Sequence, residues 1–269
     1  MTQPTDRRLS ALWMAIPALC VLFIPLAALV MASSPADLYK ALSHPVVGPA
    51  LWLSLRTSFV SLLIIIVIGT PLAWWLARSS GRSAAAIDLL LDLPIVLPPA
   101  VIGIALLETF GRAGLFGGAL EAFGLQIPFT TSAVILAQVT VSAPFYIKAS
   151  TLAFRRLEDD LLLVSRTLGH TPWRTFLRVA LPMTLPGLVT GAALSWARAL
   201  GEFGATLLFA GSLPGTTQTM PLAIYTALES DLDIARALAL ILAGLSIVLL
   251  LGLRLSPQLL RTLRPGGRS

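Results

Sequence analysis

Long apolar segments alternate with shorter polar ones along the chain. The apolar segments predict six membrane-crossing helices at residues 11–32, 51–77, 89–107, 131–154, 184–210 and 234–253. Each is continuous over about 20 residues, the length that a helix needs to cross a bilayer. Barrel strands would instead alternate in polarity over about ten residues. The pattern therefore predicts an all-α polytopic membrane protein with one transmembrane domain over residues 11–253.

Composition supports a membrane protein. Of the 269 residues, 56% are hydrophobic and 12% are charged, and the mean hydropathy is +0.86. A soluble domain carries about 25% charged residues. The first apolar segment follows a basic start, as in a cleaved signal peptide, but it exceeds the 7–15 apolar residues or so that are usual there. We therefore expect a retained first span.

The basic residues lie on one side of the predicted spans. A net charge of +6 could indicate a nucleic-acid partner, but basic loops held in the cytoplasm explain it better. If the N-terminus is cytoplasmic, only Lys40 and Arg112 remain in outer loops. Residues 1–10, the loop 155–182 and the tail 254–269 are therefore expected in the cytoplasm, with Arg7, Arg8, Arg78, Arg82, Arg155, Arg156, Arg166, Arg174, Arg178, Arg254, Arg261, Arg264 and Arg268.

The cytoplasmic segment 161–182 reads LLLVSRTLGHTPWRTFLRVALP. Its apolar residues recur at helical spacing up to Leu168, Gly169 interrupts the pattern, and Pro172 stands where a second helix would begin. An amphipathic helix, a glycine hinge and a second helix predict a docking element for a soluble partner.

The third span contains DLPIVLPPAVIG, in which Pro94 and Pro98 are four residues apart on one helical face. Each proline removes a backbone donor and kinks a helix. The sequence leaves two interpretations of these prolines: a structural kink, or a hinge beside a translocation path. Lys148, inside the fourth span, is expected to extend toward the interface that follows.

The fifth span contains WARALGEFGAT and places Arg198 and Glu202 inside the membrane. Each charge costs roughly 2.5–3.5 kcal/mol at the bilayer centre. Four residues apart on one helical face, they can form a structural bridge, or Arg198 can offer its charge to a passing anion. Gly201 and Gly204 allow the close approach of a helix or of a solute.

The chain has no motif for chemistry of its own. It has no G-x-x-x-x-G-K-[ST] loop for ATP, no H-E-x-x-H and no G-x-S-x-G. Cys20 is the only cysteine, which excludes an intrachain disulfide and a cysteine-based metal site. We expect no catalytic residue and no metal site, and a chain that supplies a path.

The docking segment resembles the cytoplasmic loop of binding-protein-dependent ABC importer permeases. In that family a glycine is followed, after nine residues, by an aliphatic residue, any residue, leucine and proline. Gly169, Val179, Leu181 and Pro182 match this spacing. The usual Glu-Ala-Ala start is replaced by the segment 163–165, whose three residues are Leu163, Val164 and Ser165. The acidic trio Glu158, Asp159 and Asp160 just upstream is a conjectural substitute for the missing glutamate.

Further segments resemble the molybdate-type permeases, with tungstate and sulfate permeases as near relatives: LDLPIVLPPAVIG, PFTTSAVILAQVTVSAPFY and LPGTTQTMPLAIYTALESDLD, besides the two already quoted. The resemblance implies the type I importer fold, a permease homodimer, two copies of a separate ATPase that binds ATP and magnesium, and an external oxyanion-binding protein. The location implied is the plasma or inner membrane of a bacterium or archaeon. The implied coupling residues are Leu163, Val164, Ser165, Gly169, Trp173, Arg174, Phe176, Arg178, Leu181 and Pro182.

Two other classes of protein remain. A secondary carrier with the same six spans would move its substrate without nucleotide. A membrane-embedded regulator or assembly subunit would transport nothing.

Overall fold

The computed structural model describes the backbone of residues 4–262 and the side chains of residues 16–36 and 38–252. Within these residues every regular element is a helix, and η1 is a π-helical turn. In chain order the elements are α1 (Pro4–Met31), α2 (Pro35–Leu42), α3 (Val47–Arg78), α4 (Arg82–Val96), α5 (Pro99–Phe110), α6 (Gly117–Ala122), α7 (Thr131–Arg155), α8 (Asp159–Thr167), α9 (Pro172–Thr175), η1 (Phe176–Ala180), α10 (Leu181–Leu200), α11 (Gly204–Ala210), α12 (Met220–Leu228) and α13 (Leu232–Thr262).

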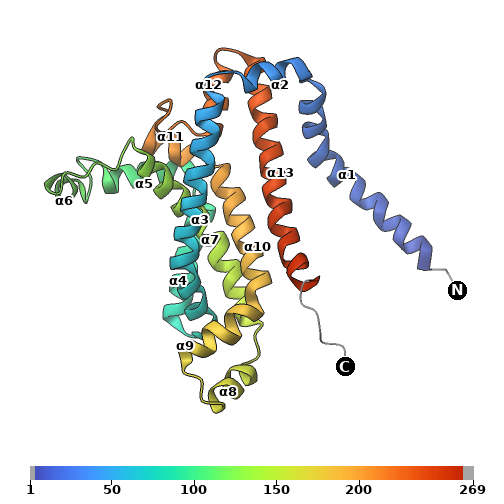
Figure 1. Ribbon diagram of the computed structural model, residues 1–269, viewed down its shortest axis with the longest axis vertical. Helices are drawn as coiled ribbons and strands as arrows, with labels where there is room; N and C mark the ends of the chain where they lie inside the picture. Colours follow the sequence, from blue (N-terminus) through green and yellow to red (C-terminus); the bar gives the residue numbers. More distant parts are fainter. Residues whose placement is uncertain (1–3, 263–269) are drawn as a thin grey trace.

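Helices α3, α7 and α10 pack against one another as the centre of the bundle (Figure 1). α13 packs along α10 and α12, whereas α1 leans away from the bundle. The start of α1, the end of α13 and the α8–α9 hairpin point toward one end of the molecule, and α2 and α12 lie at the other (Figure 1). This is the arrangement that the charge pattern predicts.

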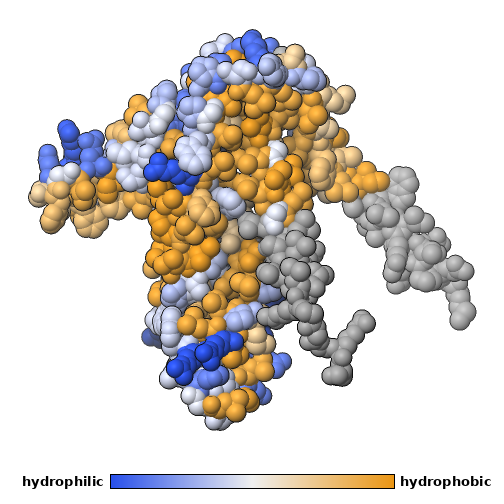
Figure 2. Space-filling model, viewed as in Figure 1, coloured by the Kyte–Doolittle hydropathy of each residue, from blue (hydrophilic) through white to orange (hydrophobic). Residues whose placement is uncertain are grey.

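Short polar side chains join the central helices. Ser61 Oγ donates to Gln138 Oε1 at 3.0 Å, and Trp196 Nε1 donates to Ser58 Oγ at 2.9 Å. In lipid the hydrophobic effect does not drive helices together, so hydrogen bonds of this kind help to hold them against one another. Most of the outer surface between the polar ends is apolar (Figure 2), as expected of a surface in contact with lipid.

Four helical runs are long and apolar enough to cross a membrane: α3, α7, Pro172–Leu200 and Leu232–Gly252. α4 and α5 together make a fifth candidate, bent by 112°. Ile16–Met31 is a shorter apolar helix within the described side chains. The all-α membrane fold is confirmed, and the count of six spans is reached only if the bent pair and α1 are both included.

The third predicted span is not one kinked helix, so that prediction is wrong. α4 ends at Val96 and α5 begins at Pro99. Leu97 (ψ 138°) and Pro98 (ψ 135°) are both extended, because a residue that precedes a proline is driven out of the helical region. Two consecutive prolines therefore break the helix, and Pro94 and Pro98 do not share a helical face.

The fifth predicted span, 184–210, also differs from the structure. Its helical run begins earlier, at Pro172, and ends at Leu200. Residues 201–203 are not helical, and α11 is a separate short helix. Leu181 and Pro182, predicted in the loop, lie inside the long run. Pro182 has no N–H to donate, and the wider π turn of η1 just before it accommodates the proline.

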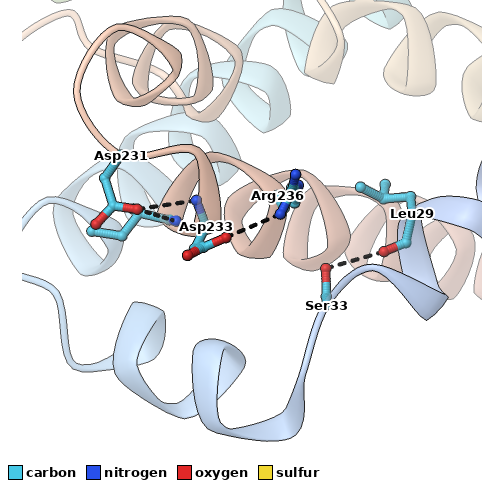
Figure 3. Close-up of polar contacts among 6 residues, drawn as sticks. Leu29, Ser33, Asp231, Asp233 and Arg236 are labelled. Carbon is cyan, nitrogen blue, oxygen red and sulfur yellow. Dashed lines mark hydrogen bonds and ion pairs between the residues drawn. The ribbon is translucent and has the colours of Figure 1, made fainter.

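Short helices also occupy the predicted loops: α2 within 33–49, α6 within 108–130 and α12 within 211–233. At the start of α13, Asp231 Oδ1 accepts hydrogen bonds from the backbone N–H groups of Asp233 and Ile234, at 3.0 and 3.2 Å (Figure 3). Arg236 pairs with Asp233 at 3.0 Å. The arginine side chains predicted in the two termini, before residue 16 and after residue 252, lie outside the described side chains.

Candidate functional site

The segment between α7 and α10 is a helical hairpin with a glycine at its tip. Gly169 has φ +84°, a left-handed conformation that favours glycine and ends a helix. The N–H of His170 bonds to the Ser165 carbonyl at 3.2 Å. Thr171 then caps α9 by accepting from Arg174 N at 3.3 Å, and Pro172 follows as the first helical residue. The helix–glycine–helix prediction is confirmed.

Ser165 joins the two arms of this hairpin. Its side chain is buried, and its hydroxyl lies 3.1 Å from His170 Nδ1 and 3.1 Å from Thr175 Oγ1. The third residue of the variant 163–165 segment therefore fixes the angle between α8 and α9 from inside.

An aromatic cluster anchors the hairpin to the bundle. Phe176, 9% exposed, lies edge-on to Trp74 of α3 with ring centroids 5.2 Å apart. Trp74 also meets Phe154 of α7 edge-on at 5.2 Å. Trp173 stacks on Phe176 at 5.6 Å but remains 67% exposed. Edge-on and offset ring pairs add to the stabilisation from apolar burial alone, so η1 is held firmly against α3 and α7.

Arg78, the last residue of α3, braces the same junction. Its guanidinium lies over the Trp74 ring, 4.9 Å from the centroid. It donates to the carbonyl oxygens of Phe154 and Leu157 at 3.1 and 3.3 Å, and it forms an ion pair with Asp159 at the start of α8. One side chain thus connects α3, the end of α7 and the hairpin.

The outer face of the hairpin carries exposed apolar and basic side chains. Leu163 and Val164 are 61% and 56% exposed, and Leu168 at the tip is exposed as well. Arg174 and Arg178 are also exposed, on the opposite arm. Exposed apolar side chains flanked by arginines form a surface suited to a partner protein.

The acidic trio upstream, the conjectural substitute for the missing glutamate, lies at the start of the hairpin. The Asp159 carboxylate is engaged by Arg78 within the chain. Glu158 and Asp160 are exposed. Asp160 lines a surface cavity of about 420 Å³ with Leu163 and Arg166. Of the three, Glu158 and Asp160 are placed to meet a partner.

Arg198 and Glu202 do form a pair, as the sequence predicts. Arg198 Nη1 lies 2.8 Å from Glu202 Oε2, and the glutamate side chain is 1% exposed. Its location is corrected, however: Glu202 is not in the middle of a helix but in the break after α10. The second carboxylate oxygen, Oε1, accepts from Ala205 N at 2.8 Å. Glu202 therefore caps α11 as well as pairing with Arg198, which gives it a structural role.

The glycines beside Glu202 have separate roles. At Gly204 a Cβ would lie 3.1 Å from Pro99 Cβ and 3.3 Å from Ala100 N, so this glycine allows α5 to approach α11. At Gly103 of α5 a Cβ would lie 2.9 Å from the Ala205 carbonyl oxygen. At Gly201 a Cβ would lie 3.6 Å from the Ala197 carbonyl oxygen of α10. The close approach of a helix is thus seen at Gly204.

Sequence reasoning missed one charged cluster. Lys148 pairs with two aspartates of α4, with Nζ 2.6 Å from Asp92 Oδ1 and 3.5 Å from Asp88 Oδ1. The i, i+4 spacing of the two aspartates within an apolar helix was the available signal. Within the described side chains, no group of three or more His, Cys, Asp or Glu residues could hold a metal ion.

A known protein family and two named relatives match most of the chain. A family model described as binding-protein-dependent transport system inner membrane component matches residues 69–261. The molybdenum transport system permease protein ModB of Mycobacterium tuberculosis is 43% identical over 255 residues, which are 94% of this chain and 96% of the relative. The protein of the same name from Escherichia coli K12 is 40% identical over 182 residues, 67% of this chain and 80% of the relative.

Solved structures share the fold at low sequence identity. A bacterial ABC transporter involved in the import of the acidic polysaccharide alginate superposes with a TM-score of 0.71 at 18% identity, covering 93% of this chain and 94% of that one. The MetNI methionine ABC transporter, in an inward-facing conformation, gives 0.62 at 20% identity, covering 81% and 96%. These likenesses establish the architecture of the bundle and not its substrate.

Proposed function

The chain belongs to the family of inner membrane components of binding-protein-dependent transport systems, and from that premise we propose that it is the permease subunit of an ATP-driven molybdate importer. The observation that carries the substrate is the 43% identity, over nearly the full length of both chains, to a protein named as a molybdenum transport permease. Tungstate and sulfate are tetrahedral dianions of similar size and are the runner-up substrates.

The assembly we propose has a homodimer of this chain in the plasma or inner membrane, two copies of an ATPase below it and an oxyanion-binding protein outside. Both termini and the α8–α9 hairpin face the cytoplasm, and ATP with magnesium binds to the partner ATPase. The open face of α8, with Leu163 and Val164 exposed, supports docking of that ATPase on the hairpin.

In this mechanism the hairpin transmits movement of the ATPase pair to the spans. A lever of this kind has to be stiff, so that differential contacts in two states move it as one body. Arg78, Ser165 and the Trp74–Phe154–Phe176 cluster give that stiffness. The helix that follows η1 runs without a break to Leu200, next to the Arg198–Glu202 pair. Displacement of the hairpin therefore reaches the membrane interior directly.

The test is uptake into proteoliposomes that hold this chain, its cognate ATPase and the external binding protein. We expect molybdate uptake that requires ATP and stops with an ATPase variant unable to hydrolyse it. Binding protein loaded with molybdate should raise the rate of ATP hydrolysis. Competition by unlabelled tungstate and sulfate in excess then ranks the preference of the assembled importer for the three anions. Uptake without the ATPase subunit would instead identify a secondary carrier, and hydrolysis without uptake a regulatory subunit.

A further inference from the structure

The Asp88–Asp92–Lys148 cluster joins α4 to α7 on the side of the break in the third span that leads to the cytoplasmic end. Lys148 Nζ lies 2.6 Å from Asp92 Oδ1 and 3.5 Å from Asp88 Oδ1. One lysine faces two carboxylates, so the cluster carries a net negative charge with all three groups ionised.

The position of these residues makes contact with lipid costly. Lys148 lies two helical turns before the end of α7 at Arg155, which is about 10 Å along the helix axis. Asp92 lies ten residues after the start of α4, or about 15 Å. The side chains of Asp88, Asp92 and Lys148 are 45%, 44% and 32% exposed. Charges at such depth face the interior of a bundle or a water-filled cavity rather than lipid.

The opposite face of α4 has the character of a lipid-facing surface. Residues two apart on a helix point in nearly opposite directions, because each residue turns the helix by about 100°. Leu90 lies midway between Asp88 and Asp92 in sequence and therefore opposite them, and it is 60% exposed. Val96, four residues after Asp92 and on the charged side, is 79% exposed. Asp88, Asp92 and the exposed Val96 thus share one side of α4, and the exposed Leu90 lies on the other.

We propose that the Asp88–Asp92–Lys148 cluster lines a water-filled cavity on the cytoplasmic half of the translocation path. In that place Lys148 offsets the two carboxylates, which would otherwise repel an anion leaving toward the cytoplasm. The water-filled cavity is inferred from depth, exposure and charge alone. The role of Lys148 in anion passage rests on the proposed function.

Thiol accessibility tests the cavity independently of transport. In a Cys20→Ser background, which leaves no other cysteine, Asp92→Cys should react with a membrane-impermeant maleimide added to inside-out vesicles holding the whole transporter. Val96→Cys, which leaves all three charges in place, should react as well. Leu90→Cys is the matched control and should react at least tenfold more slowly. Equal reactivity at 90 and 96, or none at 92 and 96 because lipid or a second copy covers them, would overturn the proposal.

Charge compensation tests the role of Lys148. Lys148→Gln should lower the rate of molybdate uptake by about tenfold, in line with the effect of local charge on ion concentration in a cleft, whereas Lys148→Arg should retain most of it. Lys148→Gln combined with Asp92→Asn returns the cluster to its original net charge and should restore uptake. A Lys148→Gln transporter as fast as wild type, or a double variant as slow as the single one, would refute this role. Absence of uptake by the wild type would count against the proposed function instead, leaving the accessibility result standing.

Discussion

Glu202 illustrates how a single buried charge is balanced at the residue scale. Its two oxygens have different partners, Arg198 Nη1 for Oε2 and the N–H of Ala205 for Oε1. The arginine side chain is 28% exposed and the glutamate is 1% exposed, so the carboxylate depends on its partners far more than the guanidinium does. Loss of one partner of a buried pair costs about 3–5 kcal/mol, because the remaining charge is left uncompensated.

This asymmetry predicts the outcome of a double-mutant cycle. Arg198→Met should lower the thermal stability of the detergent-solubilised complex more than Glu202→Gln, whose amide oxygen can still accept from Ala205. The double variant should be more stable than Arg198→Met alone, because it no longer buries an unpaired carboxylate. The thermal stability of the wild type, the two single variants and the double variant is measured by heating each protein and following the intact complex by size-exclusion chromatography. If Arg198→Met loses transport but keeps full stability, the arginine acts on the anion and the bridge is not its role.

At the scale of elements, Arg78 braces the junction at which the α8–α9 hairpin leaves the bundle. Its hydrogen bonds to the carbonyl oxygens of Phe154 and Leu157 hold the end of α7. Its ion pair with Asp159, which is 86% exposed, adds less because solvent screens it.

Arg78→Gln should loosen the hairpin without unfolding the bundle. We expect amide hydrogen exchange over residues 158–170 to accelerate by about tenfold, which corresponds to roughly 1.4 kcal/mol of local stability. The molybdate moved per ATP hydrolysed should fall, because a loosened lever transmits less movement. Arg82→Gln removes the same charge from an exposed position four residues later and should change neither quantity. Unchanged exchange in Arg78→Gln would show that the aromatic cluster alone holds the hairpin.

The elements were predictable from sequence where local chemistry decides them. Gly169 and Pro172 mark the end of one helix and the start of the next, and the structure has both boundaries. From its sequence, the Leu97–Pro98–Pro99 segment predicts a kink, because hydropathy runs evenly across it. The 112° bend depends also on how α5 packs on α11. From the sequence, Arg78 is predicted only to lie on the cytoplasmic side, since its partners are 76 or more residues away in the chain. Long-range contacts of this kind leave no trace in local spacing.

At the scale of the whole molecule, the structure separates two polar ends with an apolar belt between them (Figure 2). The hairpin tip and the loop that precedes α12 lie at opposite ends (Figure 1). Leu168 is 75% exposed at the first end and Leu213 is 46% exposed at the second.

The orientation of the chain follows from these two positions. With Cys20 replaced by serine, Leu168→Cys should be labelled by an impermeant thiol reagent only in inside-out vesicles. Leu213→Cys should be labelled only in intact cells or right-side-out vesicles, because the basic loops hold the hairpin end in the cytoplasm. Labelling of both positions from the same side would contradict the proposed topology.

The π turn Phe176–Ala180 has a consequence for how the two ends of the Pro172–Leu200 run are aligned. Pro172–Leu200 is a rod of 29 residues, about 43 Å at helical rise. A π turn closes hydrogen bonds from i to i+5 and takes in one more residue than an α turn. Without that residue, the hairpin end would be rotated by about 100° relative to Trp196 near the other end of the rod. The turn therefore sets the rotational phase of the rod, so that Phe176 faces Trp74 of α3 while Trp196 faces Ser58 of the same helix.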